Sequence, residues 1–217
     1  LDRPPMKTSG RNEFGMGLKA AACWFGNLWT VESTALGSSA KYKTEVDIES
    51  YIQIYNATGF LMQVETDWVM KIINNAKKPM IVWGQGVILG KAEEELKAVI
   101  EKAGIPSAWT IMGASAIPTS HPLNIGMVGM HGNYAPNVLT NQCDVLIAIG
   151  MRFDDRVTGK LDEYATQAKV IHFEIDPAEI DKNVKTDVAV LGDAKACLTK
   201  LLPLLNSNTH SNWHQKF

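Results

Sequence analysis

Two arginines and two aspartates follow an apolar run closely, in the order Arg152, Asp154, Asp155 and Arg156. The run ends at Gly150, where the missing Cβ lets backbone amides come close to a bound anion. An arginine guanidinium offers a planar set of donors that fits a phosphate or a carboxylate. These residue types therefore predict the edge of a crevice that binds an anionic ligand. The alternative is a surface loop in which the Asp and Arg side chains pair with one another.

Glycine-rich and small-residue turns follow other strand-like segments. Gly84-Gln85-Gly86 follows one of them, and such a turn can approach the diphosphate of a nucleotide, although Gly-x-Gly alone is a weak signal. Thr110–Ser115 is a second turn, and Gly126–Gly132 carries His131. His131 could face a ligand or could be a packed turn histidine. The turns agree with a ligand of the nucleotide type.

Acidic residues end the later strand-like segments, with Glu174 and Asp176 after one and Asp193 after the next. An acid in this position commonly accepts a hydrogen bond from a ribose hydroxyl or an adenine amino group of a dinucleotide. Each acid taken alone is more often the N-cap of a helix, and Asp193 is well placed for that role. The ligand interpretation depends on whether these strand ends share one edge of a sheet.

The elements that would hold these residues alternate between strand and helix. Short apolar runs bounded by turn residues are typical of strands buried on both faces of a parallel sheet. Repeated β–α units predict an α/β fold, a doubly wound, Rossmann-like parallel sheet of about six strands over residues 67–205, with strand 144–149 near its centre. The predicted strands are 79–83, 105–110, 144–149, 169–176 and 188–193. One predicted helix begins at 65–67, and three others cover 91–103, 133–140 and 194–205. A crossover connection is predicted through 161–167.

Residues 1–66 lack a sustained hydrophobic period of either a strand or a helix. Segments 18–29 and 46–55 could each form a short helix, and no chemical motif occurs in this part of the sequence. We therefore assign no function to residues 1–66, and we expect residues 206–217 to form a C-terminal tail.

Composition excludes several classes of protein. The chain has 217 residues, of which 46% are hydrophobic and 20% charged, with a net charge of −2, so it has no basic footprint for nucleic acid. No apolar stretch approaches the roughly 20 residues of a membrane-spanning helix. Cys23, Cys143 and Cys197 are far apart, which favours reduced thiols and a cytoplasmic protein. Neither the histidines nor the cysteines have the spacing of a metal site, so none is predicted.

Four stretches together resemble the central domain of the acetolactate synthase (acetohydroxyacid synthase) family, large catalytic subunit. They are Gly126–Gly132, Arg152–Leu161, Ile171–Asn183 and Leu191–Asp193. The Arg-Phe-Asp-Asp-Arg-Val-Thr-Gly sequence that begins at Arg152 is highly characteristic of that family among thiamine-diphosphate enzymes. The resemblance runs from about Trp68 to Leu205.

The resemblance implies a function for the parent enzyme. In this family the central domain binds FAD, which has no net redox role, and the other two domains hold thiamine diphosphate and Mg²⁺. The family joins two 2-ketoacids, pyruvate with pyruvate or 2-ketobutyrate, with loss of carbon dioxide, at the start of branched-chain amino-acid synthesis. A homo-oligomer and a small regulatory subunit are also implied.

The resemblance also implies cofactor-binding residues in this sequence. Gly84 and Gly86 would allow the backbone to approach FAD, and the Asp155–Arg156 pair would line the channel to the thiamine cofactor and meet the second substrate. The remaining implied FAD contacts are Thr110, Ile111 and Met112 along its middle; Val128, Gly129, Met130 and His131 near the flavin; Gly150, Met151, Arg152, Asp154, Arg156 and Val157 on the other side; and Glu174, Ile175, Glu179 and Asp193 around the adenosine end.

The sequence departs from the family in two places. The family's His-Glu-Gln motif is absent, because the five histidines are followed by Pro, Gly, Phe, Ser and Gln. The Gly-Asp-Gly motif with a later Asn-Asn is also absent, and Gly192-Asp193-Ala194 lacks the last glycine. We therefore expect a fragment that forms no acetolactate from pyruvate by itself, even with thiamine diphosphate, Mg²⁺ and FAD. Turnover by a purified sample free of host enzyme would contradict this expectation.

Two other classes of function stay open on the sequence alone. A thiamine-diphosphate enzyme of the glyoxylate carboligase or pyruvate oxidase type shares the architecture, but is not expected to carry the Arg-Phe-Asp-Asp-Arg-Val-Thr-Gly sequence. A non-catalytic nucleotide-binding module would also fit the isolated chain. Comparing candidate ketoacids in an assay of the whole enzyme would separate the enzyme classes.

Overall fold

The computed structural model describes residues 28–34, 41–47 and 68–216. The chain divides into two compact units, Leu1–Phe60 and Leu61–Phe217. In the first unit, strands β1 (Leu28–Thr34) and β2 (Lys41–Asp47) pair antiparallel. The suggested helices at 18–29 and 46–55 are therefore wrong where they overlap these strands, and their other residues lie outside the described ranges. Tyr42, Thr44 and Val46 alternate with charged residues, which is the period of a strand.

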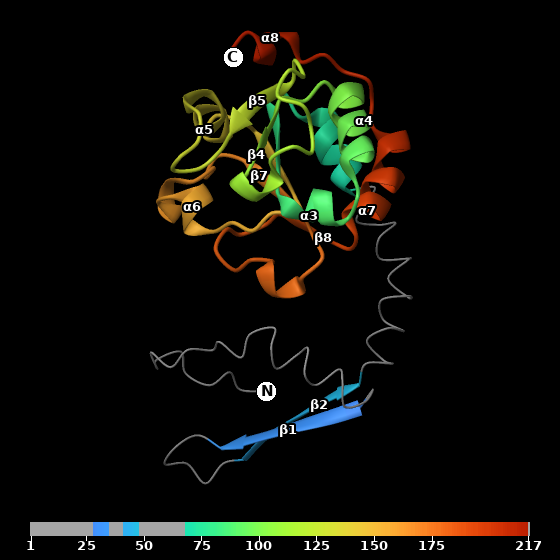
Figure 1. The fold of residues 1–217 in the computed structure, drawn as a ribbon, viewed down its shortest axis with the longest axis vertical. Coiled ribbons are helices and arrows are strands. Elements are labelled where there is room, and N and C mark those ends of the chain that lie inside the picture. The colour runs from blue at the N-terminus through green and yellow to red at the C-terminus, as the bar shows by residue number, and fades with distance from the viewer. Residues whose placement is uncertain (1–27, 35–40, 48–67, 217) are drawn as a thin grey trace. The chain divides into compact units, whose positions relative to one another are not determined.

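The second unit contains a six-stranded, all-parallel sheet in the order β5-β4-β3-β6-β7-β8. Figure 1 shows strands of this sheet among the surrounding helices. The sheet confirms the predicted doubly wound fold, with residues 145–149 as one of the two central strands. Strand β5 had not been predicted as a strand, because it is short, only half-buried and contains Gly126 with φ +110°. The strands are β3 (Pro79–Trp83), β4 (Ser107–Trp109), β5 (Asn124–Met127), β6 (Val145–Ile149), β7 (Lys169–Glu174) and β8 (Val188–Leu191).

The helices agree with most of the predicted ones, with differences at their ends. The predicted crossover at 161–167 contains a single 3-10 turn, and the predicted helix 194–205 changes to a 3-10 turn where Pro203 follows Leu202. Residues 68–75 form a helix, and the expected N-cap of this helix at 65–67 lies outside the described residues. The α-helices are α3 (Gln85–Leu89), α4 (Glu93–Ala103), α5 (Tyr134–Thr140), α6 (Asp155–Thr158), α7 (Ala194–Leu201) and α8 (Ser211–His214). The 3-10 helices are η1 (Ile111–Gly113), η2 (Leu161–Glu163), η3 (Pro177–Glu179) and η4 (Leu202–Leu204).

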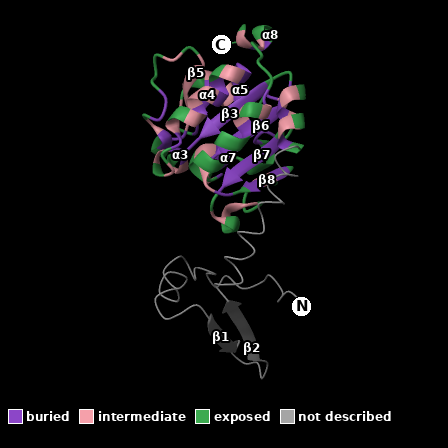
Figure 2. Cartoon of the chain, turned by 90° about the vertical axis from the view of Figure 1, so that its right-hand side faces the viewer, coloured by how far each residue is buried: buried purple, intermediate pink, exposed green. Residues whose placement is uncertain are grey.

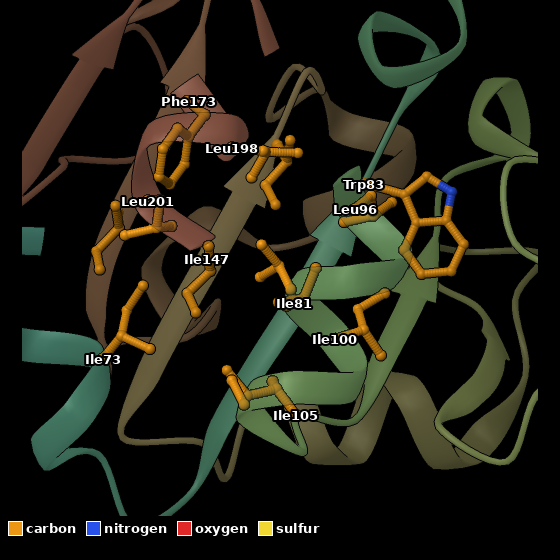
Figure 3. Packing of buried hydrophobic residues seen from close by; sticks show 14 of the residues in the cluster. Ile73, Ile81, Trp83, Leu96, Ile100, Ile105, Ile147, Phe173, Leu198 and Leu201 are labelled. Atoms are coloured by element: carbon orange, nitrogen blue, oxygen red, sulfur yellow. The ribbon is translucent and has the colours of Figure 1, made fainter. Parts of the chain in front are cut away.

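Alternate residues of the buried strands face two separate apolar clusters. In β3, Ile81 and Trp83 belong to one cluster, whereas Met80 and Val82 belong to the other. The first cluster is closed by α4 and α7, and Figure 3 shows side chains of both helices against those of the strands. The second cluster includes residues of α5 and α8. Figure 2 shows the buried strands behind α4 and α7, which cover one face. Because residues of α5 and α8 belong to the second cluster, helices cover both faces, as the continuous apolar runs had indicated.

The chain changes direction across the sheet between β3 and β6. From β3 the order proceeds through β4 to β5 on one side, and from β6 through β7 to β8 on the other. The two strands end together, since Trp83 lies opposite Ile149. In open α/β sheets, ligands bind outside the carboxyl ends of the strands at such a topological switch point. The glycine turns after β3 and β6 lie at this point.

The C-terminal residues pack against the same domain rather than extending from it. The side chain of Trp213 in α8 is only 2% exposed, and its Nε1 donates a hydrogen bond to the Pro79 carbonyl at 2.9 Å. His214 lies 2.8 Å from the Gly104 carbonyl through Nε2, and the Asn208 amide donates to the Lys102 carbonyl. Across the described ranges, no helix has the length and apolar character needed to cross a membrane.

Candidate functional site

The predicted site residues gather at the carboxyl-terminal edge of the sheet. Backbone hydrogen bonds extend the sheet one residue past the strands, for example from the Thr110 amide to the Trp83 carbonyl and from the Val128 amide to the Trp109 carbonyl. The strand order places the 128–131 turn at one end, the 110–112 turn next to it, the glycine turns in the middle and Glu174 and Asp193 at the other end. A ligand along this edge would meet these groups in that order.

The glycines at the switch point contact each other rather than open space. A Cβ on Gly86 would lie 2.6 Å from the Gly150 Cα, and one on Gly84 would lie 2.6 Å from the Gly150 oxygen. The Gly84 amide donates to Ile149, the Gly86 amide to Gly150, and the Gly150 amide to Phe173. These three amides are therefore already engaged by backbone carbonyls. The missing Cβ atoms serve close packing of two turns, a reason that the sequence alone did not reveal.

Apolar side chains project from the same edge. Ile111, Met112, Met130 and Ile175 are between 57% and 67% exposed, although each is a large apolar residue. The η1 turn that carries two of them is fixed because Trp83 Nε1 donates to the Gly113 carbonyl at 2.9 Å. Exposed apolar side chains that gather at one edge indicate a surface that binds a ligand or another protein segment, whereas single scattered ones are ordinary.

The loop after β5 is held by contacts that the sequence analysis missed. The Asn137 side chain in α5 accepts from the Gly129 amide at 2.9 Å and donates to the Gly129 carbonyl at 3.0 Å. The Met130 amide donates to the Arg156 carbonyl at 2.8 Å, which ties this loop to the start of α6. Gly129 is buried with φ +101°, and a Cβ there would lie 2.5 Å from the Arg156 oxygen. Two segments of the predicted site, far apart in the sequence, are thus brought together.

The charged segment after β6 pairs only loosely with itself. The closest N–O distance is 3.8 Å for Arg152 with Asp154 and 3.7 Å for Arg156 with Asp155, and the two arginine side chains are 64% and 70% exposed. Such exposed pairs contribute little to stability. The Asp154 side chain caps α6 by accepting from the Arg156 and Val157 amides. The guanidinium groups therefore remain accessible to an anionic ligand.

The acids at the other end of the edge mostly have local partners. Glu174 is 8% exposed, and its Oε1 accepts from the amides of the two residues that follow it. Asp176 caps η3, Asp193 caps α7, and Glu179 pairs with Lys182 at 2.7 Å. The N-cap alternative is therefore correct for Asp193 and Asp176. A carboxylate that caps with one oxygen still offers the other to a ligand hydroxyl.

The other predicted residues differ in accessibility. Thr110, Val128 and Met151 are buried, Val157 is half-buried, and His131, the possible packed turn histidine, is exposed. Three surface hollows in the described part are lined by none of the predicted site residues; the largest, of about 590 Å³, lies on the α5 surface around Tyr134 and Asn137. None of these three hollows therefore coincides with the predicted site. Burial raises the pKa of the Cys143 thiol to about 12, so this cysteine is not a nucleophile here.

A buried histidine lies directly beneath the charged segment. His172 in β7 is fully buried, and its Nε2 lies 2.8 Å from the Met151 carbonyl. Burial lowers the pKa of His172, so the imidazole is neutral, and Nε2 carries the proton because a carbonyl only accepts. Glu174 Oε2 lies 3.8 Å from Nε2, beyond hydrogen-bonding distance. The sequence analysis did not select His172, although a polar residue inside a buried strand must have a partner.

Substitutions at Asp193 can separate the contribution of its N-cap hydrogen bond from that of its negative charge. Replacing Asp193 by alanine is expected to lower the free energy of unfolding by about 0.5–2 kcal/mol, because the Ala196 amide loses its side-chain acceptor. Asp193→Asn keeps an acceptor oxygen at the same position and should lose much less. Urea unfolding without added ligand measures both variants. Equal losses for both would show that the carboxylate charge matters here, not the cap.

The chain is similar to known thiamine enzymes. Residues 66–201 match the family described as "Thiamine pyrophosphate enzyme, central domain". An acetolactate synthase of Mycobacterium bovis is 52% identical over 135 residues, which cover 62% of this chain and 22% of the relative. A probable acetolactate synthase large subunit of Methanocaldococcus jannaschii is 45% identical over 170 residues, covering 74% and 28%. The acetolactate synthase large subunit of Corynebacterium glutamicum is 44% identical over 158 residues, covering 73% and 25%. The matched region thus spans between 22% and 28% of these relatives' length.

Proposed function

Because the chain belongs to the thiamine pyrophosphate enzymes through their central domain, we propose that it forms the FAD-binding central domain of an acetolactate synthase catalytic subunit. The observation that carries the proposal is the gathering of the turns at 84–86, 110–112, 128–131 and 150–157 at one edge, next to Glu174 and Asp193. Relatives named acetolactate synthase support the choice of enzyme.

The side chains at this edge fit FAD chemically. A flavin is planar and largely apolar, and the exposed Ile111, Met112 and Met130 offer apolar contact surface on the β4 and β5 side. The diphosphate is anionic, and Arg152 and Arg156 offer accessible guanidinium donors. The engaged amides of Gly84, Gly86 and Gly150 make these side chains the more suitable anion partners. The carboxylates of Glu174, at the end of β7, and Asp193, which follows β8, would face the adenosine hydroxyls.

For the parent enzyme we propose the condensation of two 2-ketoacids with loss of carbon dioxide. Bound FAD would take no net part in electron transfer, whereas thiamine diphosphate with Mg²⁺, bound outside this domain, would supply the reactive carbon. Within this chain, Asp155 and Arg156 are the candidates to meet the second ketoacid, because their side chains are exposed beside the proposed flavin loop. An arginine suits the carboxylate that every 2-ketoacid carries.

The cellular setting of the parent enzyme is also proposed from the family. We infer a cytoplasmic homo-oligomer with a small regulatory subunit, as the resemblance implies. Residues 67–205 would be its cofactor-binding domain. Residues 1–66 receive no function in this proposal.

Adding FAD is expected to stabilise the folded domain, since a ligand that binds only the native state adds free energy of unfolding. At about one hundred times the dissociation constant, the gain is about 2.7 kcal/mol. Arg152→Ala should weaken FAD binding by about 1–3 kcal/mol, the range for a lost charge-assisted hydrogen bond. Melting curves with and without FAD, with flavin fluorescence for affinity, measure both effects.

Lys160→Ala is the matched control for the FAD experiment. Lys160 is a similarly exposed cation near α6, it pairs with Glu163, and it lies outside the proposed site. Its loss should leave FAD affinity unchanged. An unchanged melting curve at high FAD, with the domain folded, would contradict the proposed site in this chain. If Arg152→Ala and Lys160→Ala weaken FAD binding equally, Arg152 acts only through its positive charge and makes no specific contact.

A further inference from the structure

We infer that His172 is a positioning residue that sets the course of residues 150–154 and thereby the direction in which Arg152 leaves the sheet edge. The inference rests on the proposed function, since it assigns His172 a role in presenting Arg152 to an anionic cofactor. Two observations support the inference. The buried imidazole makes one hydrogen bond, which goes to this segment. Along the segment, buried and exposed side chains alternate.

The sheet register provides the space for His172. His172 lies opposite Ala148 in the parallel β6–β7 pair, so the two side chains share one face of the sheet. The alanine is small and fully buried, which leaves room beside it for an imidazole under the end of β6. His172 is therefore placed below the turn that starts at Gly150.

Both inward residues of the segment contact this imidazole. Nε2 of His172 donates to the Met151 carbonyl at 2.8 Å, and the Phe153 ring meets the imidazole edge-on with centroids 4.9 Å apart. Asn183 Nδ2, from another loop, donates a hydrogen bond to the Phe153 carbonyl and holds the same segment. Met151 and Phe153 are 3% and 4% exposed. The segment is thus anchored at two alternate residues.

The alternation directs Arg152 outward. In an extended segment, side chains point to opposite sides in turn, so a residue between two buried neighbours must face away from the core. Arg152 lies between Met151 and Phe153, and its side chain is 64% exposed with its carboxylate contact at 3.8 Å. The contacts below the segment, not those of the guanidinium, therefore determine where Arg152 projects.

Core packing alone does not explain a histidine at this position. Its Nδ1 is buried and has no hydrogen-bond partner among the described residues, which disfavours the folded state. An apolar side chain of similar size would fill the space without that cost. The Nε2 donor gives the imidazole a use that an apolar side chain lacks.

The experiment compares His172→Gln with His172→Met. Glutamine can bring an N–H donor to nearly the same point, whereas methionine fills the volume without a donor. We expect His172→Met to increase amide hydrogen exchange across residues 150–158 and to raise the FAD dissociation constant by about 3–10-fold, as for one lost hydrogen bond. His172→Gln should stay within about threefold of the unsubstituted chain. Melting temperatures need not follow this order, because methionine removes the unpaired buried Nδ1 but also leaves the Met151 carbonyl without its donor.

His214→Met is the matched control at the opposite edge of the sheet. His214 Nε2 lies 2.8 Å from the Gly104 carbonyl, so the substitution removes a similar imidazole contact far from the proposed site. It should leave exchange across 150–158 and FAD affinity unchanged. Unchanged exchange in folded His172→Met would overturn the inference, as would equal FAD affinity in the unsubstituted, Gln and Met forms. If the unsubstituted chain binds no FAD, the proposed function fails, whereas the exchange data still decide the role of His172.

Discussion

Replacing Gly150 by alanine is expected to lower the free energy of unfolding by about 2–5 kcal/mol, measured by urea denaturation without ligand. Two causes add. Gly150 has φ +56°, a conformation that costs an L-residue with a Cβ about 1–2 kcal/mol. The new Cβ would also lie 2.7 Å from the Gly86 Cα and 2.9 Å from the Val87 nitrogen. Both contacts are backbone atoms, which cannot rotate away as a side chain could.

Relief of this crowding would have to separate the two central turns. That movement would strain the hydrogen bonds from Gly84 to Ile149 and from Gly86 to Gly150, at 3.0 Å and 2.9 Å. Gly159→Ala is the matched control, because Gly159 has φ +59° but no atom within 4 Å of its Cβ position. It should show the cost of the backbone conformation alone, about 1–3 kcal/mol, because Gly159 combines its positive φ with a ψ of −120°. If the Gly150 and Gly159 variants unfold at the same urea concentration, the close approach of the turns is wrong.

Much of the fold could be predicted from the sequence because local patterns carry it. The apolar run 145–149 is central and buried on both faces, and the period of residues 93–103 matches a helix with one face against the sheet. Strand β5 escaped prediction because its residues are half-buried, so no apolar run marks it. The strand order also could not be derived, since it depends on which edges pair in three dimensions.

The candidate site was predicted by residue type but not by partner. A glycine after a strand indicates that something comes close, yet only the structure identifies the neighbour of Gly86 as the backbone of Gly150. Asn137 and His172 were missed because each acts through a hydrogen bond to a distant backbone carbonyl. A polar residue between Ile171 and Phe173 in a buried strand was the available signal for the second.

The C-terminal segment was predicted as a tail, but it packs on the domain, and we expect Trp213 to make its largest contribution to stability. Trp213→Ala is expected to lower the free energy of unfolding of the Leu61–Phe217 unit by about 3–5 kcal/mol, the range for removing a large buried aromatic residue. The indole belongs to the apolar cluster on the α5 side and is 2% exposed. Its Nε1 donates to the carbonyl of Pro79, the first residue of a central strand. Urea denaturation of the whole chain, with tryptophan-independent circular dichroism as the signal, measures the loss.

Two further variants separate the contributions of Trp213. Trp213→Phe keeps most of the packing but leaves the Pro79 carbonyl without its indole donor, so it should cost less than alanine by at least about 1 kcal/mol. Asn212→Ala changes an exposed neighbour in the same short helix and should stay within about 0.5 kcal/mol of the unsubstituted chain. If Trp213→Ala is no worse than Asn212→Ala, α8 does not pack on β3 in solution. A large loss confined to the Trp213 variants would instead establish that residues after 205 are part of the folded domain, because one buried side chain there stabilises the central strand.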